Sequence, residues 1–534
     1  MSETEFDYIV CGAGSAGCTV AERLSRDPDV TVCVLEAGGS DNSAIIRTPM
    51  LLQFAVTGEE FNWGYWTEPQ KNLKDRKLLW PRGKTLGGSS SINAMHYMRG
   101  AKENFDEWEQ TYGAEGWGWN NALPAFKEVQ DQQRGASELH GAGGPLSVED
   151  ITPLNPLTDA FFKAGDQLQY KRNADFNGPE QEGFGPYQVT QRNGKRCSAA
   201  DAFLRPALDR ANCAVSMKTM VRKIIIENGR ATGVEVEIDG TLTELKARKE
   251  VILSGGAINS PQTLLLSGIG PGDELREAGV SVEHDLPGVG KNLQDHLDVT
   301  AQIWTKSSIS IGNSLRSIPH HVYMMGRMVL MGDGPAFVNP VQGGAFIKSA
   351  YAEDLPDLQL VFIPAISNPH GIEKAWGHGV TLHVCQLYPR SRGEIRLKST
   401  DPNDHPLIQP NYLDEEFDAD VMTDGLAKVR EILRAPAFDF DRKEERYPGA
   451  HVTNRAELMD DVRNRAETLY HPTSTCAMGS GELSVVDSRC RVKGVDRLRV
   501  IDASVMPRLV GGNTNAPTIM IATRAAAMIA EDNA

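Results

Sequence analysis

The sequence has few cysteines and no long apolar run. Its eight cysteines are widely spaced, with no Cys-X-X-Cys pair and no Cys/His cluster at metal-ligand spacing. This pattern argues against a disulfide framework or a metal site, and it is typical of small core residues in a reducing compartment. No apolar stretch reaches the about eighteen residues of a membrane span, and the N-terminal MSETE is too polar for a secretory signal. We therefore expect a soluble, cytoplasmic protein without a membrane span.

The sequence also lacks any block of basic residues. Asp and Glu number 71 against 55 Lys and Arg, which gives a formal net charge of −16. This balance disfavours nucleic acid and anionic membranes as partners. The 534 residues are enough for two or three domains, and a hydrophobic fraction of 40% is ordinary for a globular enzyme. No internal repeat or low-complexity segment is present, and the oligomeric state, monomer or dimer, stays open.

Residues 6–36 hold the strongest local signal. A short apolar run ends in Gly12-Ala-Gly-Ser-Ala-Gly17, helical spacing follows, and a second apolar run stops at Glu36. In a βαβ dinucleotide site the first glycine permits the turn, the second lets pyrophosphate approach and the third lets helix and strand pack. The terminal acid accepts the ribose hydroxyls. The alternative is a glycine-rich turn without a ligand, and the motif does not distinguish FAD from NAD.

Apolar periodicity and turn signals predict most other elements. Asn228-Gly229 and Asp239-Gly240 are strong hairpin turns. A segment rich in Gly, Pro and Asn, residues 140–193, indicates a change of domain. The predicted strands are 215–226, 231–238, 242–247, 250–253, 358–362, 379–387, 393–397 and 498–503. The predicted helices are 198–211, 260–267, 419–433 and 517–530, with further helices within 102–134.

Four stretches resemble a known family. Two of them, PRGKTLGGSSSIN at 81–93 and GGAINSPQTLLLSGIG at 255–270, look like the two signature motifs of the glucose–methanol–choline (GMC) oxidoreductases. The C-terminal stretches YHPTSTCAMG at 470–479 and GGNTNAPT at 511–518 are similar to the catalytic segments of that family. The resemblance runs from the first strand to the last helix and is greatest to the choline-dehydrogenase-like, alcohol-oxidising branch.

The resemblance implies FAD rather than NAD, and an α/β fold of two domains. A Rossmann-like FAD-binding domain would be built from residues 1–150, 197–298 and 465–534. A substrate-binding domain, 151–196 and 299–464, would hold an antiparallel sheet flanked by helices. Family members with covalent FAD carry His where this chain has Ile92, so we expect non-covalent FAD. The implied FAD contacts are Gly12, Gly14, Ser15, Ala16, Gly17, Glu36, Ala37, Trp63, Arg82, Leu86, Gly88, Asn93, Met95, Val221, Tyr470, Asp502, Ala503, Asn515 and Pro517.

The resemblance also implies the chemistry. His471 would take the proton of an alcohol, Asn515 would donate a hydrogen bond to the same oxygen, and flavin N5 would accept the hydride. The expected function is FAD-dependent oxidation of a primary alcohol to the aldehyde, with oxygen or another electron acceptor. Without the resemblance, His471 is more simply a structural histidine. The alternatives are a hydroxynitrile-lyase-type enzyme and a redox-silent flavoprotein. Six other histidines are interpreted as structural or surface residues: His96, His140, His320, His321, His378 and His383. Among them His96 is the exception, because it lies close to the loop that is expected to face the flavin.

Overall fold

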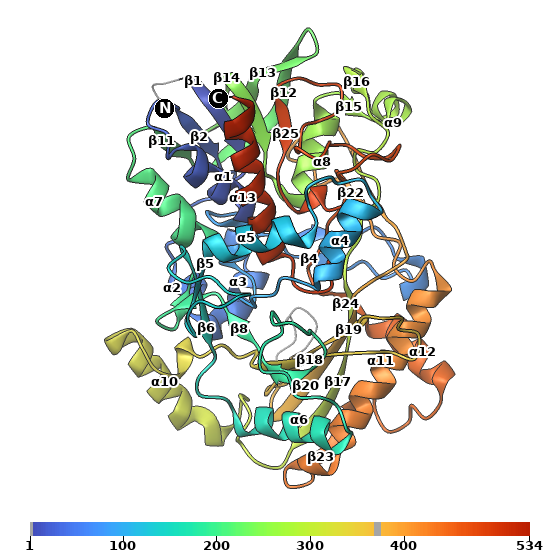
Figure 1. Ribbon diagram of the computed structural model, residues 1–534. Helices are drawn as coiled ribbons and strands as arrows, with labels where there is room; N and C mark the ends of the chain where they lie inside the picture. Colours follow the sequence, from blue (N-terminus) through green and yellow to red (C-terminus); the bar gives the residue numbers. More distant parts are fainter. Residues whose placement is uncertain (1–3, 368–374, 534) are drawn as a thin grey trace.

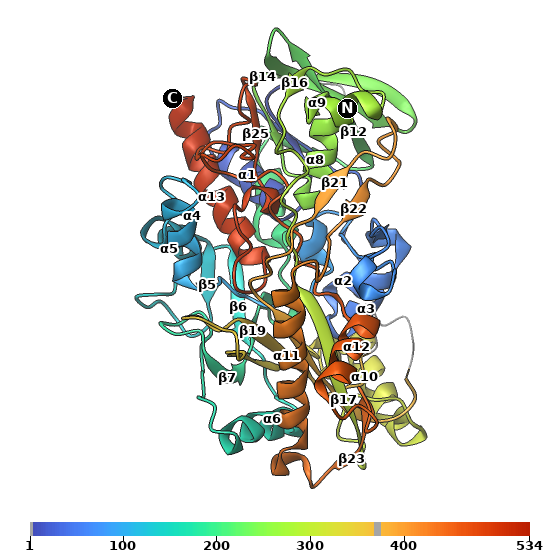
Figure 2. The same cartoon turned by 90° about the vertical axis from the view of Figure 1, so that its right-hand side faces the viewer.

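Two β-sheets organise the chain, one in each half of the molecule (Figures 1 and 2). The computed structural model describes residues 4–367 and 375–533, so the first three residues of the polar N-terminal segment lie outside it. In this described part no helix is both long enough and apolar enough to cross a bilayer. The sheets are mixed with helices throughout, in agreement with the predicted α/β class.

The first sheet contains the predicted βαβ unit. Its strand order is β11-β2-β1-β14-β13-β12, and β25 also pairs with β14. The strands are β1 (Glu5–Cys11), β2 (Val32–Leu35), β11 (Cys213–Ser216), β12 (Thr219–Glu227), β13 (Arg230–Ile238), β14 (Thr241–Leu253) and β25 (Leu498–Val500). In β1, Val10 lies beside Val34 on one side and Ile252 on the other, and the parallel centre of the sheet is buried. Continuous apolar runs are typical of parallel strands covered on both faces.

Strand β14 joins two segments that the sequence pattern separated. Residues 242–247 and 250–253 were predicted as two strands, but both belong to β14. Its first half pairs antiparallel with β13 and its second half pairs parallel with β1. In the first half of β14 exposed and buried side chains alternate, and at 250–253 all side chains are buried. This change made one strand look like two in the sequence.

The second sheet is antiparallel. Its order is β23-β17-β20-β19-β18-β7, and β24 also pairs with β17. The strands are β7 (Gly183–Pro186), β17 (Leu297–Thr305), β18 (Gly343–Ile347), β19 (Leu358–Ile363), β20 (Gly379–Gln386), β23 (Arg442–Tyr447) and β24 (Glu467–Thr468). Helices α6 (Pro156–Gln167) and α11 (Glu416–Arg434) pack against the sheet and share one apolar core with it. Strand β24 lies in the segment 465–534, which was predicted to belong to the FAD-binding domain, yet it pairs in this second sheet. The predicted domain boundaries stay a prediction.

Two long-separated helices pack together over the first sheet. Helix α1 (Ser15–Leu24) contacts α13 (Asn515–Asp532), and α13 also contacts α5 (Trp119–Val129). Aromatic residues of the neighbouring segment 102–134, among them Phe105, Trp108 and Phe126, are buried. The predicted strand 393–397 forms β21 (Glu394–Arg396), which pairs only with β22 (Leu407–Gln409) in a separate hairpin within the described residues.

The remaining elements are short or peripheral. The helices are α2 (Ala44–Arg47), α3 (Leu52–Thr57), α4 (Lys102–Gln110), α7 (Arg205–Leu208), α8 (Gly256–Leu266), α9 (Gly272–Glu277), α10 (Ile318–Met331) and α12 (Arg455–Arg465). The strands are β3 (Tyr65–Trp66), β4 (Leu79–Trp80), β5 (Gln130–Gln132), β6 (Leu146–Asp150), β8 (Gln188–Val189), β9 (Gln191–Arg192), β10 (Lys195–Arg196), β15 (Ile269–Gly270) and β16 (His284–Asp285).

Candidate active site

A cavity of about 600 Å³ is lined by residues from both sheets. Of the site residues predicted from the sequence, Gly17, Leu86 and Pro517 are outside its lining, and the others contribute to it. The predicted residues that line the cavity are Gly12, Gly14, Ser15, Ala16, Glu36, Ala37, Trp63, Arg82, Gly88, Asn93, Met95, Val221, Tyr470, His471, Asp502, Ala503 and Asn515. The fold thus gathers stretches that are more than 450 residues apart in sequence around one space, as from Gly12 to Asn515.

The glycine-rich loop after β1 requires three different properties of its glycines. Gly12 has φ of +109°, and a Cβ there would lie 2.5 Å from the carbonyl oxygen of Ser254. A Cβ on Gly17 would lie 1.8 Å from the carbonyl oxygen of Gly12, because α1 packs tightly on the loop. At Gly14 the nearest atom would be 4.0 Å away, the carbonyl oxygen of Ser254. Gly14 therefore faces open space at the N-terminus of α1, where unpaired N–H groups favour an anion.

Glu36 ties the end of β2 to this loop. Its carboxylate accepts the N–H of Ala13 at 3.0 Å through one oxygen and the N–H of Gly38 at 2.8 Å through the other. Burial raises the pKa of Glu36 to about 7, although the two N–H donors oppose this shift. Each carboxylate oxygen has a second lone pair, so the residue can brace the loop and still accept a hydroxyl from the cavity.

Asp502 has a similar bracing role at the C-terminal side. Its carboxylate accepts the N–H of Gly256 at 2.8 Å, the hydroxyl of Ser260 at 2.6 Å and the N–H of Ser504 at 2.8 Å. Burial raises its pKa. These contacts join the chain after β25 to the first turn of α8, so that both lie at the cavity wall beside Ala503.

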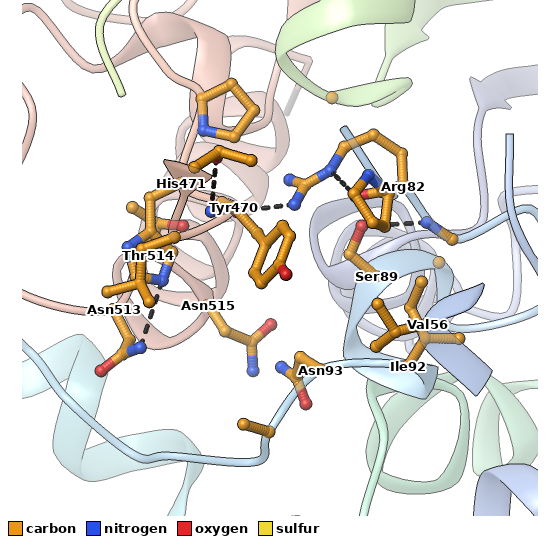
Figure 3. A pocket seen from close by; sticks show the side chains of 18 of the residues that line it. Val56, Arg82, Ser89, Ile92, Asn93, Tyr470, His471, Asn513, Thr514 and Asn515 are labelled. Atoms are coloured by element: carbon orange, nitrogen blue, oxygen red, sulfur yellow. Dashed lines mark hydrogen bonds between the residues drawn. The ribbon is translucent and has the colours of Figure 1, made fainter. Parts of the chain in front are cut away.

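The loop that follows β24 carries His471 and is fixed through its backbone. The N–H of His471 donates to Oδ1 of Asp295 at 2.7 Å. Oδ2 of Asp295 accepts hydrogen bonds from the hydroxyls of Thr468, at 2.6 Å, and Tyr412. On the other side, Nη2 of Arg82 donates to the carbonyl oxygen of Tyr470 at 2.6 Å (Figure 3). These contacts fix the backbone of His471 independently of its ring.

The ring of His471 contacts two side chains. Its Nδ1 lies 2.8 Å from Nδ1 of His296. Its Nε2 lies 3.1 Å from Nδ2 of Asn513 (Figure 3). Nε2 of His296 in turn lies 3.1 Å from the carbonyl oxygen of Leu387. A carbonyl only accepts, so neutral His296 carries its hydrogen on Nε2 and has a lone pair on Nδ1. His471 must then donate from Nδ1, so its Nε2 is unprotonated and accepts the N–H of Asn513.

Burial keeps both imidazoles neutral. It lowers the pKa of His471 well below its usual value, and the positive charge of Arg82 and a protonated His296 act in the same direction. Burial also lowers the pKa of His296 to about 4 and the pKa of Arg82 to about 10. At neutral pH the site therefore combines an unprotonated Nε2 with the positive charge of a buried guanidinium.

Asn515, which was predicted to act with His471, makes a different hydrogen bond. Asn515 begins α13, and its Oδ1 accepts the hydroxyl of Ser15 at 2.6 Å, which joins the first turns of α1 and α13. The side chain beside Nε2 of His471 belongs to Asn513, in the loop before α13. Oδ1 of Asn513 accepts from Nε2 of Gln359 at 3.1 Å, so β19 fixes its orientation.

Sequence reasoning missed several of these residues. Asp295 and His296 form a polar pair directly before the apolar run of β17, and Gln359 is a polar residue inside the apolar β19. Polar groups in or beside buried strands need partners, which is the signal that could have drawn attention to them. Asn513 was close in sequence to the predicted Asn515, but the spacing alone does not tell which amide reaches the histidine.

The second sheet supplies the far wall of the cavity. Asp298 and Thr300 of β17, Val361 and Ile363 of β19, and His383 of β20 line it. Oδ2 of Asp298 accepts a hydrogen bond from Nδ1 of His383 at 2.6 Å. Oδ1 of Asp298 and Nε2 of His383 are buried and have no hydrogen-bond partner in the described part of the chain. His383, interpreted above as structural or surface, is therefore a cavity residue, as are His96 and His321.

Comparisons with known proteins agree with this geometry. The chain matches family models described as GMC oxidoreductase over residues 6–298 and 389–522. It is 46% identical over 527 residues to "Alcohol dehydrogenase [acceptor]" of Pseudomonas putida, covering 98% of this chain and 95% of the relative. It is 43% identical to "Oxygen-dependent choline dehydrogenase" of Photobacterium profundum, covering 98% of this chain and 92% of that one.

Solved structures show the same fold. Pyridoxine 4-oxidase from Mesorbium loti superposes with a TM-score of 0.88 at 32% identity, covering 98% of both chains. A formate oxidase variant of Aspergillus oryzae gives 0.92 at 26% identity, covering 99% of this chain and 98% of that one. The family models cover more than half of the sequence and the relatives almost all of it. The chain therefore belongs to the GMC oxidoreductases, a family of FAD-binding flavoproteins.

Proposed function

We propose that the protein oxidises a primary alcohol to the aldehyde, with FAD in the cavity and His471 as the base. The observation that carries this proposal is the unprotonated Nε2 of His471, which lies at the cavity, accepts an amide N–H from Asn513 and is near a buried cation. An alcohol becomes a good hydride donor only as its proton leaves, so a base at its oxygen is the group that the reaction needs.

The cavity fits a dinucleotide along its length. Gly14 presents open backbone at the start of α1, and Glu36 stands at the end of β2, which are the places for pyrophosphate and ribose in a βαβ unit. We propose that this end holds the ADP half, with Val221 near the adenine, and that Arg82 and Asn93 lie along the flavin. When bound, FAD supplies the acceptor for the hydride.

The residues around the alcohol oxygen have separate tasks. The alcohol hydroxyl replaces the N–H of Asn513 at Nε2 of His471, and Nε2 then accepts the hydroxyl proton. Nδ2 of Asn513 donates one of its two hydrogens to the oxygen as negative charge develops. The positive charge of the Arg82 guanidinium stabilises the negative charge that develops on the alcohol oxygen. We assign the donor task to Asn513 because it is the amide that contacts His471, while Asn515, held by Ser15, contributes to the cavity wall.

His296 is a positioning residue in this scheme, because it fixes the tautomer of His471 without reaching the substrate. His296→Phe removes the acceptor for Nδ1–H and should lower kcat at least about tenfold, a part of the 10²- to 10⁴-fold that a general base contributes. His296→Gln keeps an acceptor and should recover most of that loss. Steady-state kinetics with both variants decide the point: KM should stay near the wild-type value, and an equal loss in both variants would contradict the tautomer role.

FAD is expected to bind without a covalent link. Ile92 lines the cavity beside Asn93 (Figure 3), and a hydrocarbon side chain offers no nucleophile for attachment. Acid precipitation of the purified protein should leave all flavin absorbance in the supernatant. Colour retained in the washed pellet would show that another residue forms a bond to the flavin.

The experiment that tests the proposed function is anaerobic reduction. The flavin absorbance of the purified protein should disappear on adding a reactive primary alcohol from a panel that includes aliphatic, aromatic and amino alcohols. Readmission of air then compares oxygen with other electron acceptors by the rate at which the absorbance returns. If no alcohol reduces the flavin, hydroxynitrile cleavage is the next assay, and inactivity there too would favour a redox-silent flavoprotein.

The cavity wall bears on the choice of panel. The unpaired atoms of Asp298 and His383 could bind a second polar group of the substrate, whereas Val361 and Ile363 offer apolar contacts. One relative is named for alcohols in general and another for choline, which carries a cation at the end away from its hydroxyl. The polarity of that far end is therefore the property to vary. The panel should therefore pair each apolar alcohol with a polar one of the same length.

A further inference from the structure

Helix α10 presents an apolar face to solvent. At 3.6 residues per turn, Ile318, Val322, Met325 and Val329 form one stripe, and Tyr323 and Leu330 flank it. These side chains are exposed, reaching 67% for Val322, 70% for Val329 and 81% for Leu330. No residue of α10 is buried. The helix lies at the edge of the molecule in both views (Figures 1 and 2).

The opposite side of α10 faces the protein. His321, Met324 and Met328 are half-buried there, and His321 lines the cavity together with Ile311 and Gly312 of the preceding loop. A helix at the surface of a globular protein normally turns its apolar stripe inward. In α10 the stripe points outward, and within the described residues nothing covers it. An apolar face of this kind marks a docking surface.

The charge around α10 differs from that of the whole chain. The net charge of the protein is −16, yet residues 306–332 contain no Asp or Glu and include Lys306, Arg316 and Arg327. Asp333 follows directly and pairs with Arg327 at 2.7 Å. Lys195 also lies near this C-terminal end of the helix, where it and Gly332 border the same pocket. An apolar stripe with basic flanks is typical of helices that lie in the interface of an anionic membrane.

We propose that α10 docks the protein on an anionic lipid surface, with its apolar stripe among the acyl chains and its basic residues at the headgroups. A second copy of the chain is a poorer occupant, because a two-fold contact would make the net positive charge of this segment, Lys306, Arg316 and Arg327 against Asp333, face itself. The negative total charge pointed away from anionic membranes, but the local charge of this segment has the opposite sign. Docking would place the cavity wall formed by His321 and Ile311 beside the bilayer.

The test is flotation of the FAD-loaded protein with vesicles made of equal parts phosphatidylcholine and phosphatidylglycerol. The wild type should float, and the triple variant Val322→Ser, Val329→Ser, Leu330→Ser should bind at least about tenfold more weakly, because it loses the most exposed apolar groups. A matched control replaces three exposed apolar residues elsewhere: Leu242→Ser, Phe440→Ser and Leu483→Ser. It should float like the wild type.

Three outcomes would overturn the proposal. They are a wild type that does not float, equal losses in both triple variants, and a wild-type dimer that the α10 variant alone converts to monomer while vesicle binding stays absent. The last outcome, read by light scattering, would make α10 an interface between copies of the chain. Flotation does not require turnover, so its result is independent of the proposed chemistry. Turnover of a water-soluble alcohol should be unchanged in the α10 variant, which confirms that the variant is folded.

Discussion

Replacing His471 with alanine should lower kcat/KM by about two to four orders of magnitude, the range that a general base contributes. The reason is specific to the geometry: Nε2 of His471 is the unprotonated nitrogen at the cavity, and Asn513 beside it can donate but cannot accept a proton at its amide nitrogen. The variant should retain FAD, because the backbone contacts of this loop to Asp295 and Arg82 remain. Kinetics with the alcohol that best reduces the wild-type flavin measure the loss.

Two further variants separate base chemistry from structure. His471→Gln keeps a polar side chain of similar length but provides no proton acceptor with the basicity of imidazole. It should therefore be as slow as the alanine variant, whereas a purely structural role would be largely restored by Gln. His320→Ala alters an exposed histidine outside the cavity lining and serves as the control. A loss below about fivefold in His471→Ala would remove the assignment of the base, given the range above.

The sequence predicted those parts of the molecule whose signals are local. The run from Tyr8 to Glu36 became strand, glycine loop, helix and strand, because apolar periodicity and glycine placement act over a few residues. The hairpin turns at Asn228-Gly229 and Asp239-Gly240 likewise joined β12, β13 and β14. The family resemblance, which depends on short motifs, was confirmed over nearly the whole chain.

What stayed beyond the sequence depends on contacts between distant residues. The pairing of His296 with His471 spans 175 positions, and no spacing rule connects them. Asn513 and Asn515 occur in one motif, and only the start of α13 decides that the first turns toward His471 and the second toward Ser15. The outward stripe of α10 is also hidden, because periodicity predicts an apolar face without telling which way it points.

The second large effect is expected at the glycine loop, where substitution of Gly17 should lower the stability of the fold and substitution of Gly14 should weaken FAD binding. Gly17→Ala places a methyl group 1.8 Å from the carbonyl oxygen of Gly12, so loop and helix must separate. Overpacking of this kind costs about 1–3 kcal/mol or more, and the protein without flavin should show a lowered Tm. Gly14→Ala meets no protein atom closer than 4.0 Å, so its Tm without flavin should stay near the wild-type value.

Gly14→Ala, which should leave Tm nearly unchanged, should weaken the binding of FAD. The methyl group of Gly14→Ala would occupy the space through which the pyrophosphate approaches the start of α1, so Kd for FAD should rise by about tenfold or more, equivalent to about 1.4 kcal/mol. Gly39→Ala is the matched control, because a Cβ there meets nothing within 4 Å and the residue is outside the cavity lining. Flavin fluorescence titration of the flavin-free proteins measures the affinity for FAD of the wild type, Gly14→Ala and Gly39→Ala. An unchanged Kd in Gly14→Ala would mean that the phosphates bind elsewhere, and the proposed placement of the ADP half would have to be abandoned even if alcohol oxidation is observed.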